Sequence, residues 1–192
     1  MDAEPRGTLF IISGPSGVGK TTVAKEVYRR LPWLRSSVTY TTRQKRRAAR
    51  EDKVIVYVTQ EEFQQRITGG QFLEWAVVHG HSYGTDRRSV EDVLAGGESI
   101  LLNIDVQGTQ TILETYPDAI TIFIEPDNTA QLEARIRERK DISEDDVRLR
   151  LENIARELAF APSYRYRVTN REGGVAATVD EVVHLVEQHT HD

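Results

Sequence analysis

The chain has 192 residues, of which 39% are hydrophobic and 29% are charged, a composition typical of one soluble domain. It contains no cysteine, which excludes disulfides, thiolate metal ligands and thiol nucleophiles. A formal net charge of −5 argues against a broad nucleic-acid-binding face, and the N-terminal apolar run is too short for a signal peptide or a membrane span. We therefore expect a cytoplasmic protein with small-molecule partners, no nucleic acid and no membrane, whose oligomeric state the sequence leaves open.

Strand and helix signals alternate along the chain. Residues 8–13 form a short apolar run, and residues 22–31 follow with Val23, Val27 and Leu31 at helical spacing. Further apolar runs of strand length cover residues 54–58, 72–78, 100–104, 119–124 and 165–169. Strands that alternate with helices predict a mostly parallel sheet, with ligands bound at the carboxyl ends of the strands.

Local signals mark where helices begin and end. The capping-box spacing, a hydroxyl three residues before an acid, predicts helix starts at Thr59–Glu62, Ser143–Asp146 and Thr178–Glu181. Paired glycines predict breaks between elements at 69–70, 96–97 and 173–174.

Residues 14–21 read GPSGVGKT and lie between the first predicted strand and the first predicted helix. This matches G-x-x-x-x-G-K-[ST], a phosphate-binding loop whose glycines let backbone N–H groups point at anionic phosphate. Lys20 is expected to reach the β- and γ-phosphates as a catalytic residue, and Thr21 to offer its hydroxyl to Mg²⁺. The ATP-binding residues expected here are Gly14, Pro15, Ser16, Gly17, Val18, Gly19, Lys20, Thr21 and Thr22.

Several short motifs follow the phosphate loop. A basic stretch such as residues 43–53 is usually a solvated loop. Here, however, the chain reads TTR at 41–43, then Arg46, FLEWA at 72–76, SYGT at 82–85 and LNIDVQG at 102–108. With the phosphate loop and with Arg135, Arg139 and Arg150, these motifs resemble guanylate kinases in order and spacing over nearly the whole chain.

The resemblance implies a P-loop kinase of three α/β/α layers with a mostly parallel central sheet, a small mixed α/β segment and a lid. It implies one domain over residues 1–192, with a core of residues 1–37 and 89–192, a monophosphate-binding segment of 38–88 and a lid of 128–144. It also implies Mg²⁺-dependent phosphoryl transfer from ATP to GMP or dGMP, a reaction of purine nucleotide metabolism.

The resemblance further assigns an acceptor site. Its members are Arg43, Arg46 and Tyr83 around the acceptor phosphate, and Thr39, Glu74, Thr85 and Asp105 around guanine. Guanine presents N1–H and N2–H₂ donors, which carboxylates such as those of Glu74 and Asp105 match. The alternative for Glu74 is a solvent-facing position on its strand, and the alternative for Tyr83 is a position in the aromatic core. We expect Trp75 in the aromatic core.

Three arginines lie in and beside the expected lid. The resemblance implies that Arg135 and Arg150 neutralise charge on the transferred phosphoryl group and that Arg139 binds ATP. Arg135 and Arg139 share a helical face, and Arg150 is expected to begin the next helix. Ordinary surface ion pairs are the alternative for all three. The resemblance also places Asn170 at the adenine of ATP.

Two positions depart from the family pattern. Ile55 stands where a tyrosine helps to bind the acceptor phosphate, so either Tyr40, expected in a loop, supplies a hydroxyl, or GMP binds more weakly, or the acceptor differs. Asn103 stands where an aspartate is common, which removes a charge near Mg²⁺. The alternatives to a guanylate kinase are a kinase for another phosphorylated acceptor, such as a ribose phosphate, and a non-catalytic peptide-binding module. The intact Lys20 and Thr21 disfavour the latter.

Overall fold

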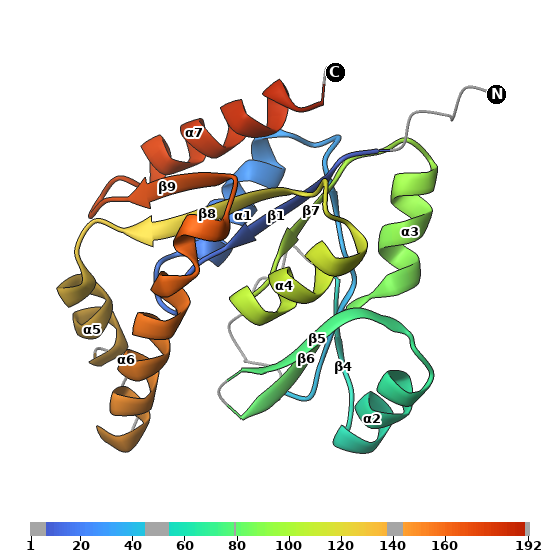
Figure 1. Ribbon diagram of the computed structural model, residues 1–192, viewed down its shortest axis with the longest axis horizontal. Coiled ribbons are helices and arrows are strands. Elements are labelled where there is room, and N and C mark those ends of the chain that lie inside the picture. The colour runs from blue at the N-terminus through green and yellow to red at the C-terminus, as the bar shows by residue number, and fades with distance from the viewer. Residues whose placement is uncertain (1–6, 45–53, 79, 138–143, 191–192) are drawn as a thin grey trace. The chain divides into compact units, whose positions relative to one another are not determined.

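A computed structural model describes residues 7–44, 54–78, 80–137 and 144–190 (Figure 1). In chain order its elements are β1 (Leu9–Ser13), α1 (Lys20–Arg30), β2 (Arg35–Ser36), β3 (Thr39–Thr41), β4 (Ile55–Tyr57), α2 (Gln60–Thr68), β5 (Phe72–Val78), β6 (His81–Asp86), α3 (Arg87–Ala95), β7 (Ile100–Asn103), α4 (Val106–Thr115), β8 (Ile120–Pro126), α5 (Thr129–Arg137), α6 (Glu144–Ala159), the short 3₁₀ helix η1 (Ala161–Ser163), β9 (Tyr166–Asn170) and α7 (Val175–Gln188). The apolar runs therefore correctly predicted strands, with ends that differ by two residues at most.

The chain divides into two compact units, which we name by their contents. The mixed-sheet unit comprises residues 1–9, 32–102 and 107–119. The phosphate-loop unit comprises residues 10–31, 103–106 and 120–192.

Two sheets carry the fold. The larger sheet has the strand order β2-β7-β1-β8-β9, and the pairs β1–β8, β2–β7 and β8–β9 are parallel. This confirms the predicted mostly parallel central sheet. The smaller sheet has the order β4-β3-β6-β5, in which β3 pairs with β4 in parallel and with β6 antiparallel, and β5 pairs with β6 antiparallel.

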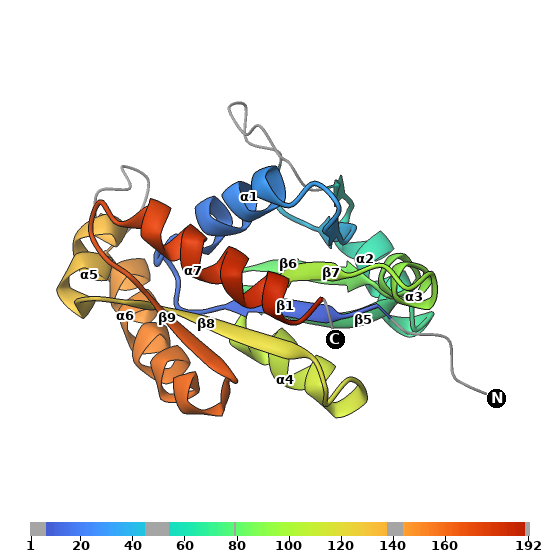
Figure 2. The same cartoon turned by 90° about the horizontal axis from the view of Figure 1, so that it is seen from above.

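The phosphate-loop unit is layered. All five residues of β1 are buried, as expected for a strand covered on both faces. Helices α1 and α7 pack against each other on one side of the strands, and α6 lies on the other side (Figure 2). On the α6 side, Phe123 of β8 packs edge-on against Tyr164 with ring centroids 4.9 Å apart, and Val106 and Ala161 complete the cluster. The three-layer α/β arrangement is thereby confirmed.

The mixed-sheet unit has an aromatic core beneath α2. Phe63 of α2 is fully buried, and its ring centroid lies 4.7 Å from that of Phe72 on β5. Thr59 and Glu62 form the predicted capping box at the start of this helix, and Gly69 ends it. The apolar face of α2 thus fixes one face of the small sheet and leaves the opposite face for polar residues.

Two of the expected helix starts are wrong, and a third lies outside the described residues. Thr178 does not cap a helix, because α7 begins at Val175 and Thr178 lies one turn inside it. Arg150 does not begin a helix, since α6 begins at Glu144. The expected cap at Ser143 lies outside the described residues.

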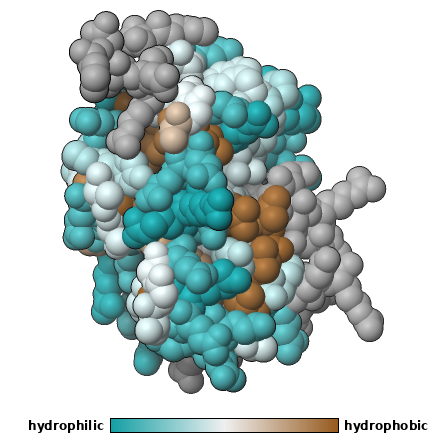
Figure 3. All heavy atoms as spheres, turned by 90° about the vertical axis from the view of Figure 1, so that its right-hand side faces the viewer, coloured by the Kyte–Doolittle hydropathy of each residue, from teal (hydrophilic) through white to brown (hydrophobic). Residues whose placement is uncertain are grey.

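Two aromatic residues lie elsewhere than expected. Tyr40 is not in a loop but in the middle of β3. Trp75 is not in the core, because it projects from β5 with 46% of its surface exposed, and Val77 follows it with 57% exposed. Figure 3 shows one face of the molecule, which is mainly hydrophilic with a small hydrophobic patch. No helix within the described ranges is both long and apolar enough to cross a membrane.

Candidate active site

Backbone conformation at the phosphate loop requires glycine at two positions. Gly14 has a φ of +143°, and a Cβ built there would lie 2.2 Å from the carbonyl oxygen of Ile124 on β8. Gly19 has a φ of +102° and directly precedes α1. A side chain at either position would strain the backbone. The glycines therefore let the loop turn closely over β8 and lead directly into the N-terminus of α1, where backbone N–H groups favour an anion.

Lys20 is the first residue of α1, and its ammonium returns to the loop. Its Nζ donates to the carbonyl oxygens of Gly14 and, at 3.0 Å, Pro15. Burial lowers the pKa of Lys20, and the nearby carboxylates of Glu157 and Asp105 oppose that shift. The ammonium thus lies at the loop itself, where it can bind phosphate. Thr21 and Thr22 follow in the exposed first turn of α1.

Glu157 of α6 contacts the phosphate loop and is not among the residues predicted from the sequence. Its Oε2 accepts the backbone N–H of Ser16 at 3.1 Å. Burial raises the pKa of the Glu157 carboxyl, while Lys20 and the Ser16 N–H act in the opposite direction. The contact spans 141 residues of sequence, so no local pattern could have predicted it.

Asn170, at the end of β9, is a buried support of the same loop. Its Nδ2 donates to the carbonyl oxygen of Val18 at 2.7 Å, and its Oδ1 accepts the Thr178 hydroxyl at 3.0 Å. A Cβ at Gly19 would lie 2.8 Å from this Nδ2. One end of the amide therefore binds the loop and the other binds Thr178 of α7, and the contact of Asn170 with adenine stays a prediction.

The smaller sheet brings together three of the four residues expected around guanine. Thr85 of β6 is in register with Thr39 of β3 on one side and with Glu74 of β5 on the other. Glu74 is only 5% exposed, so the solvent-facing alternative is wrong. The Thr85 hydroxyl donates to Oε1 of Glu74. A buried carboxylate is thereby oriented on one sheet face, beside two threonines.

The TTR motif is anchored to β6 by its hydroxyl groups. The Thr41 hydroxyl donates to the Ser82 carbonyl oxygen at 2.9 Å and accepts the Arg43 backbone N–H at 3.1 Å. The Thr42 hydroxyl accepts the Ser82 N–H at 3.0 Å. These bonds fix the backbone just before half-buried Arg43. The two threonines of the motif therefore position its arginine.

Strand register separates Tyr40 from the expected guanine site. Side chains alternate across a strand, so Tyr40 faces away from Thr39 and Thr41. Its ring lies 5.8 Å from that of Phe72, and the Arg66 guanidinium lies 4.0 Å from its centroid. Of the three alternatives for Ile55, the one in which Tyr40 supplies the missing hydroxyl is therefore wrong.

Ile55 of β4 and Tyr83 of β6 lie on the face of the smaller sheet opposite to Tyr40. Ile55 is in register with Thr39 and lies on its face, and Tyr83 is in register with Thr41. Tyr83 is half-buried. It lies two residues before Thr85 on β6, and therefore on the same face of the sheet as the pair formed by Thr85 and Glu74.

The first turn of α4 approaches the Glu74 carboxylate at a glycine. A Cβ built at Gly108 would lie 2.5 Å from Glu74 Oε2, closer than real Cβ atoms come to any neighbour. Gly108 belongs to the motif at 102–108, and this contact gives a physical reason for a glycine there.

If the substrates are GMP and ATP, as the resemblance implies, we expect Gly108→Ala to raise KM for GMP by about tenfold and to leave KM for ATP unchanged, because the methyl group would push the Glu74 carboxylate off its position. Steady-state kinetics with each substrate varied in turn measure this. Gly96→Ala is the matched control, since a Cβ there would meet nothing closer than 3.5 Å. An unaltered KM for GMP in Gly108→Ala would show that the carboxylate has room to move.

The remaining predicted site residues are distributed as follows. Asp105 lies in the phosphate-loop unit close enough to affect the pKa values of Lys20 and Glu157. Arg46 and Arg139 lie outside the described residues, as do the side chains of Arg135 on α5 and Arg150 on α6.

A phosphate loop between β1 and α1 of a three-layer α/β fold with a parallel sheet defines the class of P-loop nucleotide-binding proteins. A family model described as guanylate kinase matches residues 6–189, so the chain belongs to the guanylate kinase family. A guanylate kinase of Thermotoga maritima is 42% identical over 94% of this chain and 86% of its own. One of Fusobacterium nucleatum is 38% identical over 94% and 96%.

Two solved structures share the fold of this chain. A guanylate kinase from Anaplasma phagocytophilum is 28% identical, with a TM-score of 0.77 over 98% of this chain and 89% of its own. A shikimate kinase from Bacteroides thetaiotaomicron is 17% identical, with a TM-score of 0.54 over 94% of this chain and 98% of its own. The second likeness shows the fold alone.

Proposed function

We propose that the chain is a guanylate kinase that transfers the γ-phosphoryl group of ATP to GMP or dGMP, giving ADP and GDP or dGDP. The observation that carries the proposal is the buried Glu74 carboxylate, oriented by Thr85, in a chain that also has a complete phosphate loop. The family membership supports the same reaction.

Guanine selection rests on hydrogen-bond polarity. An ionised carboxylate only accepts hydrogen bonds, and the Watson–Crick edge of guanine offers two adjacent donors, whereas adenine has an acceptor at N1. The Glu74 carboxylate would accept hydrogen bonds from these two donors. Thr39, Thr85 and Asp105 would make further contacts with guanine. Arg43, Arg46 and Tyr83 would hold the 5′-phosphate of the acceptor.

Phosphoryl transfer needs positioning and charge stabilisation, not a protein nucleophile. The loop N–H groups and Lys20 would bind the β- and γ-phosphates, and the acceptor phosphate oxygen would attack in line. Arg135 and Arg150 would neutralise charge on the transferred group, and Arg139 and Asn170 would contact ATP. Closure of residues 128–144 over the nucleotides would exclude water and prevent hydrolysis of ATP.

Oxygen donors at the loop fit Mg²⁺. The exposed Thr21 hydroxyl lies in the first turn of α1, and the carboxylate of Asp105 lies close enough to Lys20 to affect its pKa. Mg²⁺ prefers such oxygen ligands and is usually held by few protein groups together with substrate phosphates. We propose Thr21 as its ligand. When bound, the ion would neutralise charge on the β- and γ-phosphates.

We expect Ile55→Tyr to lower KM for GMP about threefold to tenfold, because Ile55 lies on the face of Thr39 and a phenol there adds a donor for the acceptor phosphate. Ile55→Phe is the matched control, since it adds the ring without the hydroxyl. The KM for GMP of each variant is measured from initial rates. Equal values for the two variants would mean that the hydroxyl does not reach the phosphate.

The proposed reaction is tested by incubating the protein with γ-³²P-labelled ATP and Mg²⁺, with millimolar GMP in one reaction and millimolar ribose 5-phosphate in another. We expect the label to appear in GDP, with little release as free phosphate. Label that reaches a ribose phosphate and not GMP would support a kinase for another acceptor. A chain that binds neither ATP nor GMP in calorimetry would instead be a non-catalytic module.

A further inference from the structure

Glu74 faces the expected guanine site because β5 contains a bulge. Phe72 pairs with Asp86, but Glu74 pairs with Thr85, so two residues of β5 advance against one of β6. The extra residue is Leu73. A bulge of this kind adds one residue to a strand and changes the direction of the following side chains.

The bulge reverses the orientation that strand periodicity would give. In a regular strand, residues two apart point to the same face, so Phe72 and Glu74 would both face α2. Instead, Phe72 packs on Phe63 of α2, while Glu74 receives the hydroxyl of Thr85 on the opposite face. Loss of the bulge would direct the carboxylate into the aromatic core.

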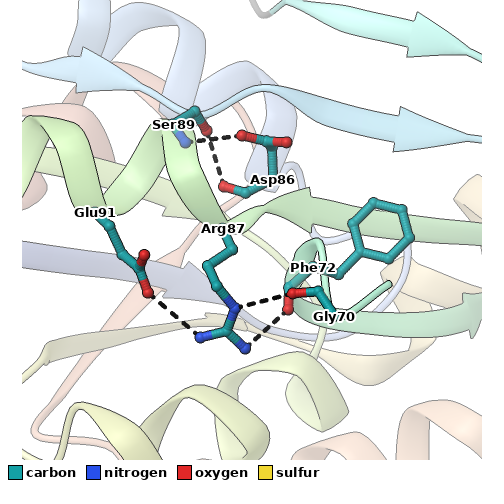
Figure 4. A network of polar contacts seen from close by, with 6 residues as sticks. All are labelled: Gly70, Phe72, Asp86, Arg87, Ser89 and Glu91. Carbon is teal, nitrogen blue, oxygen red and sulfur yellow. Dashed lines mark hydrogen bonds and ion pairs between the residues drawn. The ribbon is translucent and has the colours of Figure 1, made fainter. Parts of the chain in front are cut away.

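Arg87, the first residue of α3, holds the backbone on the N-terminal side of this bulge (Figure 4). Its Nη2 donates to the Phe72 carbonyl oxygen at 3.0 Å, and its Nε donates to the Gly70 carbonyl oxygen at 3.2 Å. Its Nη1 contacts Glu91 at 3.4 Å. One guanidinium therefore bridges the two carbonyl groups that lead into the bulge.

The start of α3 fixes the position of this guanidinium. Asp86 caps the helix, because its Oδ1 accepts the Ser89 N–H at 2.7 Å and its carbonyl oxygen accepts the Ser89 hydroxyl at 2.9 Å (Figure 4). The Arg87 backbone N–H donates to the Gln71 carbonyl oxygen at 2.9 Å. The backbone and the side chain of Arg87 thus bind three consecutive carbonyl groups, those of residues 70–72, where the chain enters β5.

We infer that Arg87 is a positioning residue for guanine selection, which holds the bulge at Leu73 and thereby the direction of the Glu74 carboxylate. The inference rests on the proposed function. Charged hydrogen bonds to two carbonyl groups at a fixed spacing suit a planar guanidinium and not an ammonium, so lysine would replace it only in part.

The test compares GMP with IMP, which lacks the 2-amino group and so offers the Glu74 carboxylate one donor fewer. We expect Arg87→Met to lower kcat/KM for GMP about tenfold and to reduce the preference for GMP over IMP, with KM for ATP unchanged. Arg87→Lys should fall between Arg87→Met and the wild type. Arg88→Met is the matched control, because Arg88 has the same charge, lies next in sequence and is 89% exposed.

A double-mutant cycle with Glu74→Gln shows whether Arg87 acts through that carboxylate. If it does, Arg87→Met will change the GMP to IMP preference much less in the Glu74→Gln background than alone. Equal changes in both backgrounds would overturn the inference. If Arg87→Met does not fold, as judged by thermal melting, the same cycle is measured with Arg87→Lys.

The outcomes separate the two proposals. A wild-type protein that makes no GDP overturns the proposed function and this inference with it. A wild-type protein that makes GDP, together with an unchanged GMP to IMP preference in folded Arg87 variants, overturns this inference alone.

Discussion

Replacing Lys20 with methionine is expected to lower kcat for GDP formation by about 10³-fold. The Lys20 ammonium contacts the loop carbonyls of Gly14 and Pro15, so it lies where the phosphates of ATP would bind. Methionine keeps the length and apolar stem of the side chain and removes the charge. Initial rates at saturating ATP and GMP measure the effect.

The control for this variant is Lys25→Met, which removes the same charge from an exposed position of α1. We expect its kcat to remain close to that of the wild type. Thermal melting should show both variants folded. A Lys20→Met enzyme within tenfold of the wild type would contradict the assignment of Lys20 to catalysis.

Glu74→Gln is expected to lower kcat/KM for GMP by about 10³-fold while kcat/KM for ATP at saturating acceptor changes little. The new amide presents a donor where the carboxylate presented an acceptor, so it can no longer accept both donors of guanine. The Thr85 hydroxyl can still donate to the remaining amide oxygen, and we therefore expect the fold to persist. Competition between GMP and AMP for labelled ATP reports the lost discrimination directly.

Glu61→Gln, on the exposed surface of α2, is the matched control for the change in charge and should behave as the wild type. A kinase that acts on a sugar phosphate would be almost insensitive to Glu74→Gln. If folded Glu74→Gln still uses ATP and keeps the kcat/KM of the wild type for its acceptor, Glu74 does not recognise guanine.

Local sequence patterns predicted the elements whose causes are local. The phosphate loop follows from glycines and a Lys-Thr pair at fixed spacing, and the capping box at Thr59 depends on two residues three apart. Buried strands such as β1 and β8 appear as short apolar runs because both of their faces are covered.

Contacts between distant segments could not be predicted in this way. Thr178 has the spacing of a helix cap, but its hydroxyl binds Asn170, and helix α7 begins earlier. Glu157 reaches the phosphate loop from α6, and only the folded chain brings them together. Tertiary packing decides such cases, and it overrides local preference.

Strand register was the main missing information at the acceptor site. The period-2 pattern of β5 breaks at Leu73, so the sequence alone does not tell which face Glu74 takes. Tyr40 illustrates the same point, because its place beside Thr39 in sequence puts it on the opposite face of β3. The sequence therefore named candidate residues for this site, and only the structure shows which face of the sheet each of them takes.

The most direct test of the account is product analysis with Mg²⁺-ATP across GMP, dGMP, IMP, AMP, UMP and ribose 5-phosphate. We predict rapid formation of GDP and dGDP, slower reaction with IMP, and rates for the other acceptors lower by about 10³-fold or more. Comparable rates with AMP, or phosphorylation of ribose 5-phosphate without GDP formation, would contradict it.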